Sequence, residues 1–250
     1  ATAINSVPMA YIESISNEDV AALPVVQFDG PIVVVDTPQA LEEACQYLSK
    51  QPILGFDTET RPSFTAGVTN KVALLQLFGG EKCFLIRLNR VQMSKALTDI
   101  LHRADIIKVG AAVKNDIVGL SKLRHFTAGG FVDLQDIVEN YGIKDKSLRK
   151  ISGIVLGKKV SKAQRLSNWE AKTLTPQQQM YAATDAWVCI AIYEKLMSLP
   201  PITPLPKDLG MTQESAKPKP QAKERKPKAA RRPHYYTHRK TKRENREKQQ

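Results

Sequence analysis

The stretch ILGFDTE, residues 53–59, is an apolar run that ends in two acids, Asp57 and Glu59. Its length and composition predict a β-strand. Side chains two positions apart on a strand point to the same face, so both carboxylates project together from the strand's end. Adjacent carboxylates repel each other unless a positive charge lies between them, and Mg²⁺ and Mn²⁺ prefer such hard oxygen ligands. Taken alone, the stretch fits a solvated surface turn equally well.

The segments around residues 53–59 carry the patterns of further strands and helices. Apolar runs at KVALLQLF (71–78) and KCFLIRL (82–88) are joined by Gly79-Gly80, which predicts an antiparallel meander of three strands. The other expected elements are a strand at 31–36, a helix at 38–50, a helix at 94–103, a strand at 105–110, a helix at 115–123 and a short strand leading into a helix over 131–142. This order predicts an α/β fold, with helices on the faces of a mixed sheet.

The last part of the patterned region, residues 145–200, is expected to be helical. Ser147 is a candidate N-cap, and Pro176 suits the first turn of a long helix over 176–197. The domain prediction is therefore an N-terminal extension over 1–30, a single domain over 31–200 and a tail over 207–250.

Positive charge is concentrated in that tail. Residues 217–250 carry 14 Lys/Arg and 3 Glu, whereas the first 216 residues carry 23 Lys/Arg and 22 Asp/Glu. The tail is rich in Lys and Pro and lacks apolar periodicity, which predicts disorder. Such a polycation, with Tyr235 and Tyr236 as stacking rings, favours non-specific attraction to nucleic-acid phosphates. A charged run that only aids solubility is the alternative.

The cysteines and the apolar runs indicate the compartment. Cys45, Cys83 and Cys189 are widely spaced and form no CxxC pair, so we expect three reduced and mostly buried thiols. We expect no signal peptide, and the IVVV run at 32–35 is too short to cross a bilayer. The expectation is a soluble, cytoplasmic protein with no membrane association.

Two later segments carry further acids. Asp116 follows the apolar strand at 105–110 and opens a helix, where an acid also simply complements the helix dipole. Tyr181 and Asp185, in YAATD, are four residues apart on the long helix and so share one face. Each of these segments alone is better explained as ordinary structure.

Taken together and in order, the three acidic segments resemble a known family. The chain is similar over residues 30–198 to the tyrosine-bearing (DEDDy) branch of the DEDD 3′–5′ exonucleases, which includes ribonuclease D and the Werner-type exonuclease domain. The resemblance rests on FDTETRPSF, KVALLQLF, KVGAAVKNDIVGL and the stretch from SLRKISGIVLG to YAATDAWV. It implies a ribonuclease H-like fold.

The resemblance also implies a mechanism. Asp57, Glu59, Asp116 and Asp185 would hold two divalent cations, Mg²⁺ or Mn²⁺, and Tyr181 would orient the attacking water. The substrate would be a single-stranded 3′ end of DNA or RNA, and the product a nucleoside 5′-monophosphate. Which sugar is preferred, and which protein partners exist, the sequence leaves open.

Four more residues have candidate supporting roles toward the substrate. Gln76 lies in the strand expected to pair with residues 53–59, and Lys114 lies next to Asp116. Lys162 and Trp169 belong to the KxQ…SNW stretch before the long helix, and for Trp169 we favour packing over stacking on a base. Two other functions are open: a non-catalytic nucleic-acid-binding scaffold, and a phosphatase of small nucleotides, against which the basic tail argues.

Overall fold

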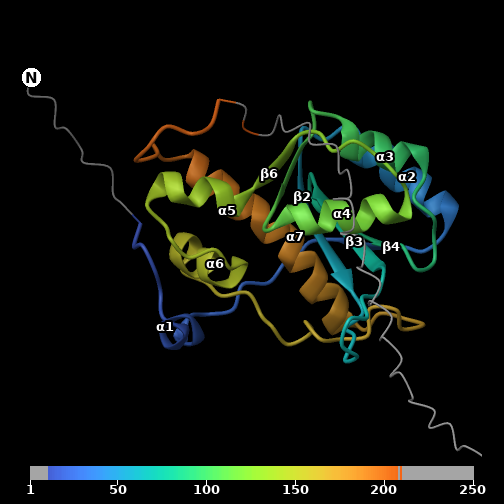
Figure 1. Ribbon diagram of the computed structural model, residues 1–250, viewed down its shortest axis with the longest axis horizontal. Coiled ribbons are helices and arrows are strands. Elements are labelled where there is room, and N and C mark those ends of the chain that lie inside the picture. The colour runs from blue at the N-terminus through green and yellow to red at the C-terminus, as the bar shows by residue number, and fades with distance from the viewer. Residues whose placement is uncertain (1–10, 208, 210–250) are drawn as a thin grey trace, which may run out of the picture. The chain divides into compact units, whose positions relative to one another are not determined.

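The computed structural model describes residues 11–207 and 209, which contain one six-stranded mixed sheet (Figure 1). Its order is β1-β4-β3-β2-β5-β6. The strands are β1 Ile32–Val35, β2 Ile53–Thr60, β3 Val72–Gly79, β4 Lys82–Arg87, β5 Ile107–Gly110 and β6 Phe131–Asp133. The pairs β2–β3 and β3–β4 are antiparallel, and the other three pairs are parallel. The predicted meander and the predicted mixed sheet are both confirmed.

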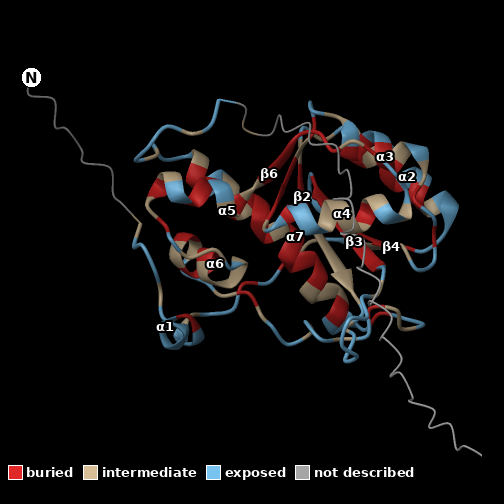
Figure 2. Ribbon diagram, in the orientation of Figure 1, coloured by how far each residue is buried: buried red, intermediate tan, exposed pale blue. Residues whose placement is uncertain are grey.

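Helices cover both faces of the sheet and bury two apolar layers (Figure 2). The helices are α1 Asn17–Ala22, α2 Pro38–Leu48, α3 Lys95–His102, α4 Val113–Leu123, α5 Leu134–Ile137, the 3₁₀-helix η1 Val138–Tyr141, α6 Leu148–Leu156 and α7 Pro176–Met197. On one face, α7 crosses the strands and packs with α5 and α6. On the other face, α2, α3 and α4 cover the same strands. The side chains of β3 are buried on both faces, as a central strand requires.

Local signals set most of the helix ends. Ser147 accepts a hydrogen bond from the Lys150 amide, which confirms it as the N-cap of α6. Thr175 and Gln178 form a capping box at the start of α7, with Pro176 at its first turn. Helix α7 therefore has the predicted bounds.

The expectation of a continuously helical stretch over 145–200 is wrong in its middle. Gly157 adopts a left-handed conformation (φ 66°, ψ 21°) that ends α6. Residues 158–175 then run without a helix until the α7 cap. Within 131–142 the predicted short strand is β6, and the helix predicted to follow it is divided into a short α5 and the 3₁₀-helix η1.

Residues 11–31, before β1, pack on the domain. Val26 and Phe28 are 6% and 5% exposed and belong to the apolar layer under α7. The Val26 amide donates to the Lys159 carbonyl (2.9 Å), and the Phe28 amide donates to the Thr184 hydroxyl (3.0 Å). The extension thus shares the core that positions α7.

The basic tail, including Tyr235 and Tyr236, lies outside the described residues apart from 207 and 209. Within the described part of the chain, no helix combines the length and the apolar character that a membrane span needs. Cys45, Cys83 and Cys189 are all buried free thiols, as predicted.

Candidate functional site

The pleat of β2 decides which of its side chains meet α7. Leu54 and Phe56 point into the layer under α2, α3 and α4. Gly55 faces the opposite way: a Cβ atom there would lie 2.1 Å from the Ala186 carbonyl oxygen of α7. Only glycine allows this close approach of strand and helix. Because side chains alternate along a strand, Asp57 and Glu59 share the α7 face with Gly55.

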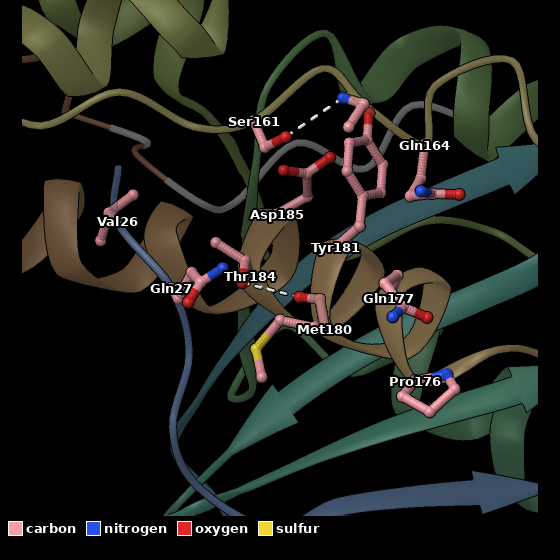
Figure 3. A pocket seen from close by; sticks show the side chains of 11 residues that line it. Val26, Gln27, Ser161, Gln164, Pro176, Gln177, Met180, Tyr181, Thr184 and Asp185 are labelled. Atoms are coloured by element: carbon pink, nitrogen blue, oxygen red, sulfur yellow. Dashed lines mark hydrogen bonds between the residues drawn. The ribbon is translucent and has the colours of Figure 1, made fainter. Parts of the chain in front are cut away.

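Helix α7 brings a third carboxylate to the same place. Asp57, Glu59 and Asp185 each offer an oxygen, and these oxygens all lie within 4.8 Å of one another. Tyr181, one turn earlier on α7, lies beside Asp185 (Figure 3), and its hydroxyl acts to lower the pKa of that carboxyl group. The alanines at 182, 183 and 186 are fully buried, so small side chains let α7 lie directly on the sheet. The prediction that β2 and α7 acids converge therefore agrees with the geometry.

Asp116 approaches from the other side of the sheet. It lies in the first turn of α4, and its Oδ1 accepts a short hydrogen bond from the Thr58 hydroxyl. Thr58 points to the α4 face because it lies between Asp57 and Glu59 on the pleated strand. Asp116 is not part of the group of three carboxylates, although its charge raises the pKa values of Asp57 and Glu59.

Asp133 fixes the start of α4, a role that the sequence analysis missed. Its two carboxylate oxygens accept hydrogen bonds from the Ala112 and Val113 amides, both at 3.0 Å. Ala112 has φ 57°, a left-handed conformation that non-glycine residues seldom adopt. The carboxylate stabilises this turn by pairing two amides that α4 leaves without helical partners.

The acids carry strongly perturbed pKa values. Burial, followed by repulsion from Glu59, Asp185 and Asp116, raises the pKa of Asp57 well above its usual range. Burial and the neighbouring carboxylates raise the pKa of Glu59 to about 9, and burial raises that of Asp185 to about 7. Burial also raises the pKa of Asp116 to about 6, against the Thr58 hydrogen bond.

No ion pair among residues 11–207 and 209 includes any of these four acids. Carboxylates that are buried or partly buried and lack a cationic partner favour either a proton or a metal ion. Oxygen-only donors this close together suit hard divalent cations such as Mg²⁺ and Mn²⁺. The donor set therefore fits the metals that the sequence predicts.

Tyr181 is held as a neutral phenol. Burial, followed by the charges of Asp185, Glu59 and Asp57, raises its pKa above the usual range. Trp169 is completely buried, and its ring lies 5.9 Å from the Tyr181 ring at 34°. A buried ring offers no face to a base, so Trp169 supports Tyr181 by packing, and a direct substrate contact does not fit its place in the structure.

The other three predicted supporting residues differ in burial. Gln76 is completely buried and pairs in register with Asp57 across β2 and β3, and neither polar atom of its amide has a hydrogen-bond partner among the described residues. Lys114, in the first turn of α4, is exposed, as is Lys162 in the segment before α7. Gln76 is thus beside the acids rather than at the surface.

Arg87 is a second residue that the sequence analysis missed. It is 3% exposed, and its guanidinium donates to the carbonyls of Ala171 and Lys172. These bonds tie the segment that carries Trp169 to the end of β4. A charged residue directly after the apolar run CFLI was the signal that could have identified it, because buried charges need partners.

A cavity of about 380 Å³ opens beside Tyr181 and Asp185 (Figure 3). Its walls come from α7, from the segment before α7 and from residues 26–27. The acids therefore stand next to a hollow large enough for a small organic group.

Comparison with known proteins agrees with this geometry. Residues 32–199 match the family model described as 3'-5' exonuclease. The chain is 32% identical over 188 residues to the bifunctional 3'-5' exonuclease/ATP-dependent helicase WRN of Mus musculus, covering 71% of this chain and 13% of that protein. It is 38% identical over 165 residues to exonuclease 3'-5' domain-containing protein 2 of Drosophila melanogaster, covering 64% of this chain and 28% of that protein.

Among solved structures, the chain is similar to Escherichia coli RNase D, with a TM-score of 0.59 and 25% identity, over 66% of this chain and 44% of that one. It spans less than a third of the length of the two relatives named above. The likeness therefore concerns one domain of each.

Proposed function

The chain belongs to the 3′–5′ exonuclease family, and on that premise we propose that it hydrolyses nucleic acid from a 3′ end and releases nucleoside 5′-monophosphates. The observation that carries the proposal is the convergence of Asp57, Glu59 and Asp185 within 4.8 Å, next to the Tyr181 hydroxyl. Asp116, which accepts a hydrogen bond from the Thr58 hydroxyl, is the fourth acid of the proposed site.

The four acids would hold two divalent cations, Mg²⁺ or Mn²⁺. Bound cations of this kind lower the pKa of water and offset the negative charge of the reacting phosphate. The raised pKa values support this assignment, because a cluster that resists ionisation by itself is stabilised when cations replace its protons.

The side chains of the chain itself orient the reaction. Tyr181, kept neutral by the surrounding carboxylates, retains the hydroxyl proton that lets it both donate to Asp185 and accept from an attacking water. Trp169 packs against the Tyr181 ring and limits its motion. Gly55 sets the distance between β2 and α7, and with it the separation of Asp57 from Asp185.

The substrate class follows from the family and from charge. The E. coli RNase D structure is described as that of an exoribonuclease involved in structured RNA processing. For this chain we propose a single-stranded 3′ end, with DNA and RNA to be distinguished by experiment. The 14 Lys/Arg of residues 217–250 would attract phosphates without regard to sequence.

The test of catalysis is digestion of 5′-labelled single-stranded DNA and RNA oligomers with Mn²⁺ or Mg²⁺. We expect a ladder that shortens from the 3′ end, absent in EDTA and absent for Asp57→Ala. The matched control is Asp36→Ala, which removes an exposed acid at the end of a different strand. An intact Asp57→Ala activity would contradict the proposal. No cleavage by the natural chain, with Mn²⁺ still raising the melting temperature, would favour a non-catalytic scaffold.

The tail has its own test. A chain truncated after Leu209 should bind single strands more weakly at low salt, and the difference should vanish as salt is raised. Equal low-salt affinity of the two chains would contradict a role of the tail in binding single strands, and the proposal for the acid site would not be affected.

A further inference from the structure

The cavity beside the acids is bordered by three stretches that are distant in sequence (Figure 3). Residues 161–164 form one border, one face of α7 from Pro176 to Asp185 forms the floor, and residues 26–27 form the opposite border. At about 380 Å³, the cavity falls within the range of roughly 300–1,000 Å³ found for small-molecule pockets. Tyr181 and Asp185 line both this cavity and the acid site.

One border comes from outside the segment that matches the family, which begins at residue 32. Backbone bonds fix this border on both sides of Gln27. Val26 donates to the Lys159 carbonyl (2.9 Å), and Phe28 donates to the Thr184 hydroxyl (3.0 Å). Phe28 also packs edge-on against Phe78, with ring centroids 5.5 Å apart. Gln27 is therefore held at a fixed place on the rim.

The lining has the chemistry of a site for a flat, uncharged ring. Its apolar part is supplied by Val26, Ala163, Pro176 and Met180. Three amide side chains, from Gln27, Gln164 and Gln177, lie around these apolar residues (Figure 3). Gln27 and Gln177 are both exposed, so their amides are accessible to a ligand. Amides offer a donor and an acceptor together, which is what the edge of a nucleobase requires.

The charges argue against a phosphate in this cavity. Its lining contains no Lys or Arg, and its one charged group is the Asp185 carboxylate. A cation lies nearby instead, since the charge of Arg165 acts to lower the pKa of Tyr181. A nucleotide whose phosphate meets the acid site would thus place its base, not a second phosphate, in the cavity.

We propose that this cavity holds the base of a nucleotide adjoining the scissile phosphate, and that Gln27 contacts that base. The proposal rests on the proposed nuclease function. It assigns a substrate-binding role to a segment that precedes the matched exonuclease domain.

The test uses the full chain and two substitutions at an exposed position. Gln27→Trp fills the cavity from its rim, and Gln27→Ala removes only the amide. The matched control is Gln92→Trp, because Gln92 is also exposed and borders a second cavity, of about 330 Å³, beside the apolar layer on the other face of the sheet. The readouts are KM and kcat for a single-stranded oligonucleotide, and the rise in melting temperature with Mn²⁺.

We expect Gln27→Trp to raise KM by about tenfold or more and to leave kcat within about twofold, which is the pattern expected when binding made equally in the ground state and the transition state is lost. Gln27→Ala should raise KM by a smaller factor, and Gln92→Trp should change neither constant. The Mn²⁺ shift should equal that of the natural chain for all three variants. An unchanged KM for Gln27→Trp overturns the proposal, and so does an altered Mn²⁺ shift, because the substitution would then act through the acids.

Failure of the nuclease function is distinguishable. If the natural chain digests nothing, the affinity for a trinucleotide is measured by calorimetry in EDTA, at a salt concentration that suppresses the contribution of the tail. Weaker trinucleotide binding by Gln27→Trp than by Gln92→Trp would support the base-binding cavity although the nuclease function had failed. Equal binding by the two variants would refute the base-binding cavity as well.

Discussion

Raising the pH from about 5 to about 7 without metal should destabilise the fold. Burial and neighbouring carboxylates raise the pKa of Glu59 from 4.5 to about 9, and burial raises that of Asp185 from 3.8 to about 7. Over this range the unfolded chain has lost these protons while the folded chain still holds at least one of them. Stability is therefore fully present below the unfolded pKa and decreases as the pH rises towards the folded pKa.

The size of the effect follows from Glu59 alone. One proton retained by the folded state costs about 1.4 kcal/mol per pH unit, or about 2.7 kcal/mol over two units. For a chain of 250 residues, each kcal/mol shifts the melting temperature by roughly 2–4 °C. The melting temperature should fall by about 5–11 °C.

The assay is thermal unfolding followed by circular dichroism in EDTA, at constant ionic strength. Glu59→Gln should make the fall smaller because an amide does not titrate, and Asp36→Asn, at an exposed acid, should leave it unchanged. With Mn²⁺ present the stabilisation should grow with pH, because protons compete with the metal for the same oxygens. A melting temperature that is constant or rises from about pH 5 to about pH 7 in EDTA would refute the reasoning.

Three further substitutions test single contacts. Gln76→Leu should raise the metal-free stability by about 1 kcal/mol, because it removes a buried amide without partners; a lower melting temperature in EDTA would show that the amide is bonded. Thr58→Val removes the hydrogen bond that lowers the pKa of Asp116, so Mn²⁺ should bind more weakly near pH 6 in a thermal titration; equal affinity would contradict a metal role for Asp116. Burial lowers the pKa of Lys108 from 10.5 to about 7. From about pH 7 to about pH 9 the amine therefore carries a proton in the unfolded chain but not in the folded chain. Because the unfolded chain binds more protons over this range, the contribution of Lys108 to stability increases as the pH rises. The stability of the natural chain relative to Lys108→Met should therefore grow by about 1.4 kcal/mol per pH unit in denaturant titrations, and a constant difference would show that Lys108 keeps its proton.

Local sequence patterns were enough for most of the fold. Ser147 and the Thr175-Pro176 pair mark helix starts through hydrogen bonds made within one turn, so no distant residue is needed to recognise them. The meander of β2, β3 and β4 is likewise a matter of short turns and apolar runs. The expectation that residues 145–200 are helical was wrong for 158–175, because Gly157 ends α6 and the segment after it is held by distant partners such as Arg87.

The candidate site was predictable in composition but not in arrangement. The spacing of Asp57 and Glu59 places them on one face, and the spacing of Tyr181 and Asp185 does the same on α7. The side from which Asp116 arrives depends on Thr58 and on the turn held by Asp133.

The sequence by itself therefore determined most of the elements and the mixed sheet, because these depend on periodicity and capping within a few residues, whereas the four acids were identified as a set by the resemblance to the exonuclease family. Only the tertiary structure decided that β2 meets α7 at Gly55, that Gln76 lies buried beside Asp57, and that Gln27 borders the cavity. These features arise where strands and helices far apart in the chain are pressed together by burial of two apolar layers. The free energy of that burial depends on the apolar area removed from water, and the spacing of residues within a short stretch of sequence does not determine that area.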